Sequence, residues 1–235
     1  LASGVTEALL YTASHDFCRA NVSLAADAAS AAVNLIGRNE GGLTLSREAA
    51  DSVLRDFKSF FVPNTRRGKY LPKRPLSIAE TIINMVISDA NKAFVVEHDG
   101  AIDALVAGLL IDEGNPRRTQ EAGDELQSTC ALALQNLALS DVGKLVLRSH
   151  VGVMDGLRRV SSSTEGSVAM TAEARRYASG ALFELDASTR RHRAASLAAG
   201  DDDGGTASAV EHVMLSYNWD HQSVVKRVNA SLQAR

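Results

Sequence analysis

Histidine and cysteine side chains are the groups in this sequence that most often bind metals or transfer protons. The six histidines are His15, His98, His150, His192, His212 and His221. No two of them lie three or four residues apart, so their spacing does not predict a metal site. His98, between Glu97 and Asp99, and His150 each come shortly before a glycine, which is typical of a structural histidine at the end of a helix.

The two cysteines, Cys18 and Cys130, lie in apolar or alanine-rich stretches. Two cysteines cannot build a disulfide framework or a four-ligand zinc site, so both are predicted to be small core residues. This usage indicates a reducing, intracellular setting, and we expect a cytoplasmic protein. No P-loop, GxGxxG, GxSxG or HExxH motif occurs, so the sequence predicts neither a catalytic residue nor a bound cofactor.

Basic residues gather in VPNTRRGKYLPKRP, residues 62–75, which contains three of the four prolines and no acidic residue. They are Arg66, Arg67, Lys69, Lys73 and Arg74. One interpretation is an anion or phosphate patch, and the other, which we favour, is a solvated loop between helical repeats. A second group, Arg190, Arg191 and Arg193, is predicted at a helix end, where cations complement the carbonyl dipole.

The charge of the chain is nearly balanced, with 25 basic and 28 acidic residues and a net charge of −3. Such a balance gives no electrostatic reason to expect nucleic acid or an anionic membrane as a partner. No run of about 18 apolar residues occurs, so no membrane-spanning helix is predicted.

The apolar composition favours helices. Hydrophobic residues make up 45% of the chain but aromatic residues only 5%, because alanine and leucine supply most of the apolar side chains. Both are strong helix formers, and small side chains let helix axes approach closely. We therefore expect an all-α fold over most of the chain.

A phrase recurs in the sequence at intervals near fifty residues. ETIINMVISDANKAFVVEHDGAIDALVAGLL, residues 80–110, aligns with TCALALQNLALSDVGKLVLRSHVGVMDGLRRV, residues 129–160. In this alignment Asn84 matches Asn136 and Gly100 matches Gly152, and both offsets are 52 residues (136 − 84 and 152 − 100). A regular offset of this size is the signature of a repeat architecture.

Two fainter copies flank this pair. ARRYASGALFELDAS, residues 174–188, places Glu184 at the asparagine position, 48 residues after Asn136. ADAASAAVNLIGRN, residues 26–39, places Asn34 there, 50 residues before Asn84. The repeat therefore extends over much of the chain.

Each of the two clear copies predicts three helices. In the later copy the apolar spacing predicts a nearly all-round apolar helix over 124–139, a short helix capped by Asp141, and a third helix after a break at Gly152. Breaks in the same order occur at Asp89 and Gly100. Such a unit cannot bury its own apolar faces, but stacked copies can cover one another, which predicts a helical solenoid. An irregular α-helical bundle is the alternative.

The phrases ALQNLA…K…L…GVMDGL and ASGALFEL resemble the armadillo repeat, over roughly residues 20–195. The resemblance implies an armadillo-like, right-handed superhelical solenoid whose concave face binds other proteins. Armadillo repeats are usually nearer forty residues, so longer loops are expected between these helices.

The end of the chain differs in character. GDDDGGTAS, residues 200–208, combines repelling aspartates with glycines and predicts a flexible linker over 200–209. Val213–Tyr217 then reads as a buried strand, and Asp220 can cap a following amphipathic helix. This order is the first half of a β-α-β unit.

HVMLSYNWDHQSVVKRV is similar to the opening of a TIR domain, whose fold is flavodoxin-like α/β. A single strand and helix cannot bury enough surface to be stable alone, so we expect the domain to continue beyond Arg235. Some TIR domains hydrolyse NAD+, and the resemblance then implies that Tyr217, Asn218 and Trp219 line the nucleotide pocket. Arginines are frequent in that turn among the enzymes, and this chain lacks them there.

The expected organisation is an armadillo-like domain over 1–199, a linker over 200–209 and a TIR fragment over 210–235. The expected function is a protein-interaction scaffold and regulatory module of an intracellular TIR-domain signalling protein, with other proteins and TIR domains as partners. The alternative is the regulatory part of a TIR-type NAD+ hydrolase, with NAD+ as substrate of the full-length protein and catalytic residues beyond Arg235.

Overall fold

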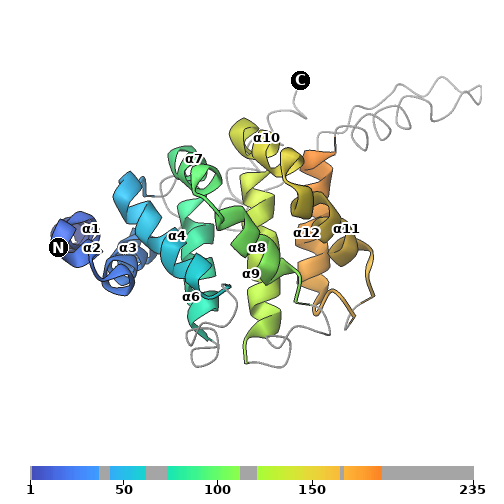
Figure 1. The fold of residues 1–235 in the computed structure, drawn as a ribbon, viewed down its shortest axis with the longest axis horizontal. Coiled ribbons are helices and arrows are strands. Elements are labelled where there is room, and N and C mark those ends of the chain that lie inside the picture. The colour runs from blue at the N-terminus through green and yellow to red at the C-terminus, as the bar shows by residue number, and fades with distance from the viewer. Residues whose placement is uncertain (1, 37–42, 62–72, 112–120, 165–166, 187–235) are drawn as a thin grey trace, which may run out of the picture. The chain divides into compact units, whose positions relative to one another are not determined.

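The computed structural model describes residues 2–36, 43–61, 73–111, 121–164 and 167–186 (Figure 1). Across these residues the regular secondary structure is α-helical and no β-strand occurs, which confirms the all-α prediction for this part of the chain. The chain divides into two units, residues 1–194 and 195–235. The second unit, with the predicted linker and the predicted strand and helix, lies outside the described residues.

The helices of the first unit follow one another through short connections. They are α1 (Ala2–Ser14), α2 (Asp16–Arg19), α3 (Val22–Ile36), α4 (Arg47–Ser59), α6 (Lys73–Met85), α7 (Asp89–Glu97), α8 (Ala101–Leu109), α9 (Gly123–Leu137), α10 (Asp141–Ser149), α11 (Val151–Ser162) and α12 (Ala172–Leu185).

Two successive triplets of helices each begin with their longest helix, followed by a helix of nine residues. The helices α6, α7 and α8 contain 13, 9 and 9 residues, and α9, α10 and α11 contain 15, 9 and 12. Equivalent helices contact each other: α6 packs on α9 and α9 on α12, while α7 packs on α10 and α8 on α11. Figure 1 shows α6, α9 and α12 as successive upright helices, with α7 and α10 along the upper edge. The segments aligned by sequence therefore occupy equivalent places in the described part of the fold.

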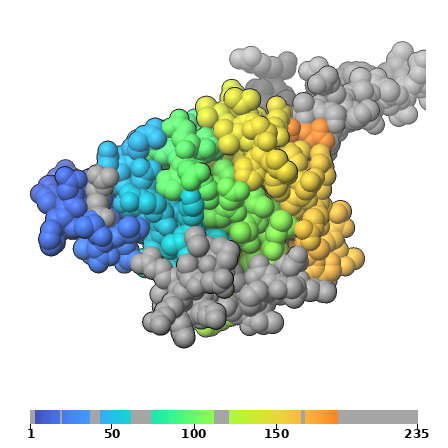
Figure 2. Space-filling view, viewed as in Figure 1, coloured from blue at the N-terminus to red at the C-terminus, as the bar shows by residue number. Residues whose placement is uncertain are grey.

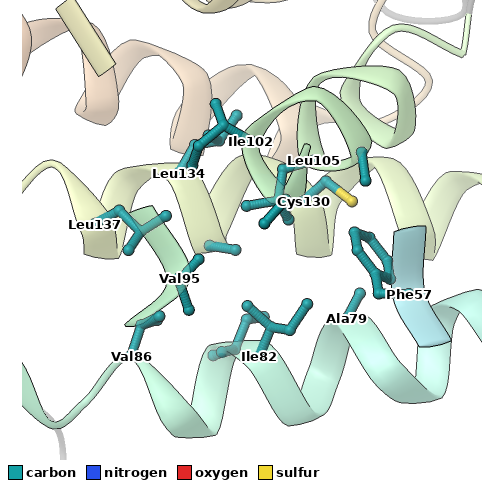
Figure 3. Packing of buried hydrophobic residues seen from close by; sticks show 14 of the residues in the cluster. Phe57, Ala79, Ile82, Val86, Val95, Ile102, Leu105, Cys130, Leu134 and Leu137 are labelled. Atoms are coloured by element: carbon teal, nitrogen blue, oxygen red, sulfur yellow. The ribbon is translucent and has the colours of Figure 1, made fainter. Parts of the chain in front are cut away.

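The core lies between these equivalent helices. Figure 3 shows Ile82 of α6, Leu105 of α8 and Leu134 of α9 gathered in one cluster, each at most 1% exposed. Burying a side chain of this size stabilises the fold by about 1.5–3 kcal/mol relative to leaving it in water. Cys130 is fully buried in this cluster, as the sequence predicted, whereas Cys18 is only partly buried.

A buried asparagine ties the segment before α4 to the first triplet of helices, α6 to α8. Asn91 of α7 is fully buried, and its Nδ2 donates to the carbonyl oxygens of Leu43 (2.6 Å) and Met85 (2.9 Å). Its Oδ1 accepts from the backbone N–H of Leu45 at 2.9 Å. The amide therefore replaces water for three backbone groups that α-helices leave unpaired.

A buried glutamine plays the same part further along the chain. Gln127 of α9 donates through Nε2 to the carbonyl oxygens of Leu109 (2.9 Å) and Val168 (2.8 Å). Its Oε1 accepts from the backbone N–H of Met170 at 2.7 Å. One side chain thus joins the end of α8 to the segment that leads into α12.

The cap of α10 differs from the prediction. Ser140, not Asp141, is the N-cap, and its Oγ accepts from the N–H of Gly143 at 3.1 Å. Asp141 is the first helical residue, where its charge still complements the positive end of the helix dipole. The prediction was one residue late because serine and aspartate are both good N-caps.

The predicted break at Gly152 is also wrong. Gly100 has a left-handed φ of 74° and caps α8, a conformation that favours glycine. Gly152 instead lies inside α11, because His150 is the N-cap and its Nδ1 accepts the Gly152 N–H at 3.3 Å. A side-chain cap therefore replaces the left-handed glycine in the later triplet.

The predicted loop over 62–75 ends earlier than expected, because Lys73, Arg74 and Pro75 lie in the first turn of α6, where proline is tolerated. Arg74 forms ion pairs with Asp27 of α3 (2.5 Å) and with Asp56 of α4 (2.8 Å), whose side chain is 1% exposed. Arg74 therefore joins three helices and belongs neither to an anion patch nor to a solvated loop. The remaining basic residues of the 62–75 segment lie outside the described residues. They are Arg66, Arg67 and Lys69.

A substitution of Gly143 tests how closely the chain approaches itself at the turn between α9 and α10. A Cβ at this position would lie 2.0 Å from the Leu137 carbonyl oxygen and 2.8 Å from the Ser140 Oγ. We expect Gly143→Ala to lower the free energy of unfolding by about 2 kcal/mol or more, measured by urea denaturation. The matched control is Gly156→Ala in α11, where the nearest atom, Leu109 Cδ2, would be 3.4 Å away. That change should be neutral or stabilise by up to about 1 kcal/mol, and equal losses in both variants would contradict the close approach.

Candidate binding face

The aligned asparagines of the first two copies meet in space. The Nδ2 of Asn84 on α6 donates to the Oδ1 of Asn34 on α3 at 2.9 Å, and the two residues are 50 positions apart. Asn34 is exposed and Asn84 is half-buried. The bond therefore joins α3 and α6 at two positions that the sequence repeat aligns with each other.

The next two aligned positions lie on the helices that continue this series. Asn136 on α9 and Glu184 on α12 are both half-buried. The Asn136 side chain makes no hydrogen bond with another of the described residues. Glu184 forms an ion pair with Lys144 of α10 at 3.5 Å. We call these four residues, Asn34, Asn84, Asn136 and Glu184, the amide row.

The helices approach closely beside the amide row. A Cβ at Gly180 of α12 would lie 2.3 Å from the Nε2 of Gln135 on α9. The glutamine side chain therefore lies directly on the α12 backbone, next to Asn136 and Glu184. This contact sets a narrow spacing between the two helices at this level.

An acidic cleft lies on the same side of α6. Its volume is about 390 Å³, and its lining residues are Leu76, Ser77, Glu80, Glu121, Ala122 and Glu125. Glu80 is one helical turn before Asn84, so the cleft and the amide row share one face of α6. We call this shared surface, the amide row together with the cleft residues, the candidate binding face.

Negative charge is concentrated in the cleft. The hydrogen bond that Glu125 shares with Asp124 raises the pKa of Glu125, and the charges of Asp124 and Glu121 act in the same direction. The same hydrogen bond lowers the pKa of Asp124. Glu80 and Glu125 form no ion pair with a lysine or arginine of the described segments. The site would therefore gain most from a cationic group.

A second cleft, of about 350 Å³, lies between the end of α4 and α8, and two of its charged side chains, Lys58 and Asp99, form an ion pair with each other. The Lys58 Nζ donates to the carbonyl oxygen (2.8 Å) and the Oδ2 (2.9 Å) of Asp99, and this cation lowers the pKa of Asp99. Asp103 is 3.2 Å from the Nε2 of His150. The lining residues are Lys58, Phe61, Asp99, Gly100, Asp103, Ala104 and Ala107.

The described histidines have structural positions. His15 is the N-cap of α2, and Cys18 lies three residues after it. His150 caps α11, as the sequence predicted for a helix-end histidine. Burial lowers the pKa of His98 at the end of α7, because the charged ring would lose its hydration. No group of three metal-binding side chains occurs among the residues that the structure describes.

The predicted nucleotide-contacting residues, Tyr217, Asn218 and Trp219, lie outside the described part of the chain, as do Arg190, Arg191 and Arg193. The sequence repeat predicted that the four residues of the amide row are equivalent, but it did not predict the acidic cleft. The spacing of Glu80 one turn before Asn84 was a signal for it, but its other wall comes from residues more than thirty positions away.

Comparison of the sequence and fold with protein-family models, curated proteins and solved structures finds no match. In the described residues no single helix is long and apolar enough to cross a membrane. Only the pair α9 and α10, bent by 119°, meets these criteria when both helices are taken together.

Two asparagines in different surroundings test whether the amide row is structural. Asn91→Ala removes three buried hydrogen bonds and should lower the free energy of unfolding by about 2–4 kcal/mol. Asn84→Ala removes one part-exposed bond and should cost about 1 kcal/mol or less. Urea denaturation of both variants measures the difference. An equal cost would mean that Asn84 has a structural role like that of Asn91 and is not available for a partner.

Proposed function

We propose that the first unit is an armadillo-like helical stack that binds segments of other proteins on the candidate binding face. The observation that carries this proposal is the bond between Asn84 and Asn34, which joins equivalent positions of two copies across 50 residues. This hydrogen bond supports the interpretation that the repeat found in the sequence is also a structural repeat. In such a stack the amide row would follow the concave face of a solenoid.

The chemistry of the amide row suits an extended polypeptide. A side-chain amide offers a donor and an acceptor, and so matches the N–H and C=O of a peptide group. The side-chain amide of Asn136 makes no hydrogen bond with another described residue, so none of these residues occupies its donor or its acceptor. Amides spaced along successive helices would bind the backbone of a partner segment without requiring a particular sequence.

The acidic cleft would add selectivity to this binding. Glu80, Glu121 and Glu125 line it, together with the apolar side chain of Leu76. A lysine or arginine from the partner could place its charge among the carboxylates and its methylene stem against the leucine. We therefore propose partners with basic side chains in an extended segment.

The role of this scaffold in the cell follows from the sequence alone. The SYNWD sequence and the amphipathic pattern that follows it support the start of a TIR domain in residues 210–235. We propose that the scaffold regulates an intracellular TIR-domain signalling protein. In the alternative, it regulates a TIR-type NAD+ hydrolase, and none of the described residues favours this alternative.

A random-peptide display library selected on the 235-residue protein tests the binding face. We expect selected peptides to contain lysine or arginine and to lose affinity about tenfold or more in Glu80→Lys and Asn136→Ala. Val151→Ser, at a 91% exposed position on α11, is the control and should bind as the wild type does. Peptides that bind all three variants equally would show that the binding face lies elsewhere.

NAD+ cleavage by residues 1–235 would contradict both proposed roles, because the alternative places the catalytic residues beyond Arg235. Residues 1–235 contain no carboxylate in a recognisable catalytic motif, so the protein should release no nicotinamide from NAD+ above the buffer control, as followed by chromatography. Nicotinamide release that Trp219→Ala abolishes would contradict both proposals and place a working nucleotide site within residues 1–235.

A further inference from the structure

Helix α10 turns an apolar side toward solvent. Leu145 is 73% exposed and Val142 is 50% exposed, while Gly143 and Leu147 on the other side are buried. Figure 2 shows α10, in yellow, at the surface of the unit. Asp141, Arg148 and Ser149 are also exposed. At helical spacing, residues 141, 142, 145, 148 and 149 form one side of the helix, which we call the α10 face.

The charges on this face are arranged so that two copies would complement each other. Asp141 lies at the start of α10, Arg148 at its end, and Leu145 between them. The charged residues are seven positions apart, or about 10 Å along a helix. In an antiparallel pair of α10 helices, each aspartate would therefore meet the arginine of the other copy. The two helix dipoles would also oppose each other favourably.

The residues next to α10 in the structure do not cover this face. α7 packs beside α10, and the end of α12 approaches it through the hydrogen bond from the Arg148 Nε to the Leu185 carbonyl oxygen (2.6 Å). Both contacts leave Leu145 and Val142 exposed. The sequence that follows Asp186, ASTRRHRA over 187–194, has no apolar side chain larger than alanine. It is therefore a poor source of apolar cover.

We propose that the α10 face binds the α10 face of a second copy of this chain, antiparallel and about a twofold axis near Leu145. A twofold axis makes each contact occur twice, so one aspartate–arginine pair per chain gives two in the dimer. A single pair of nine-residue helices buries less than a standard interface, so the dimer should be weak, with a dissociation constant of about 10 μM or higher. The proposal uses a different surface from the candidate binding face, and either can fail alone.

Sedimentation velocity of the 235-residue protein from about 1 to about 300 μM tests the dimer. The average mass should rise with concentration from 25.0 kDa toward twice that value. Leu145→Asp should weaken association about tenfold or more, and Val151→Asp, at another exposed valine, should leave it unchanged. A mass of one chain at every concentration would overturn the proposal, as would association that Leu145→Asp does not affect.

Charge reversal tests the antiparallel arrangement. Asp141→Arg and Arg148→Asp should each weaken self-association, because each brings like charges together across the axis. In a mixture of the two single variants, one chain carries two cations on the α10 face and the other two anions, so heterodimers should form. The double variant Asp141→Arg/Arg148→Asp should recover association.

Circular dichroism and thermal unfolding of each variant show whether the variant is folded, so that a loss of association can be separated from a loss of folding. Folded single variants that show no recovery in the mixture and none in the double variant would overturn the antiparallel pairing. If Leu145→Asp lowers only the melting temperature while the wild type stays monomeric, another segment of the same chain covers the face, and the proposal is wrong.

Discussion

The described fold depends on helices whose apolar surfaces are too wide to be buried within one triplet. α9 is the clearest case, because eight of its fifteen residues are buried and, at helical spacing, they cover nearly half of the helix circumference. α6 covers one side of it, α8 a second and α12 a third. One neighbouring helix cannot cover a face this wide, so α9 is held by neighbours from both sides of it in the sequence. Close approach is possible because glycine or alanine lies at the contacts, as at Gly108 against Cys130 and at Gly180 against Gln135.

Buried polar side chains decide how the connections follow this stack. Asn91 and Gln127 each satisfy three backbone groups from segments that have no helical partner. Leaving such groups unpaired in the core would cost about 1–3 kcal/mol each. Arg74 acts similarly on the buried carboxylate of Asp56 and the exposed one of Asp27. The loops are therefore positioned by a few specific side chains, while the helices are positioned by apolar area.

The two clefts differ in a way that bears on binding. In the cleft between α4 and α8, Lys58 forms an ion pair with Asp99, so these two charges offset each other, and the Nε2 of His150 lies 3.2 Å from Asp103. In the acidic cleft, glutamates from α6 and from the start of α9 line the same space, and the hydrogen bond with Asp124 raises the pKa of Glu125. A site lined by charges of one sign gains most from a partner of the other sign. This contrast favours the acidic cleft, together with the amide row, as the binding face.

The sequence by itself determined the helical class, the order of helices in the triplets and the alignment of Asn34 with Asn84. These features follow from local spacing and from a regular offset, which need no knowledge of three-dimensional contacts. Local rules were less reliable at single residues, since Ser140 replaced Asp141 as a cap and His150 replaced Gly152 as a helix boundary.

Only the tertiary structure decided which polar residues were structural and which remained available. Asn91 and Asn84 are seven residues apart and chemically identical, yet one is fully buried with three bonds and the other is part-exposed with one. The sequence predicted that Arg74 belongs to a basic loop, but in the structure Arg74 pairs with Asp27 of α3 and with Asp56 of α4. The acidic cleft likewise needs residues from α6 and from the segment that begins α9. Burial and pairing depend on groups distant in sequence, so the spacing of residues along the chain does not contain them.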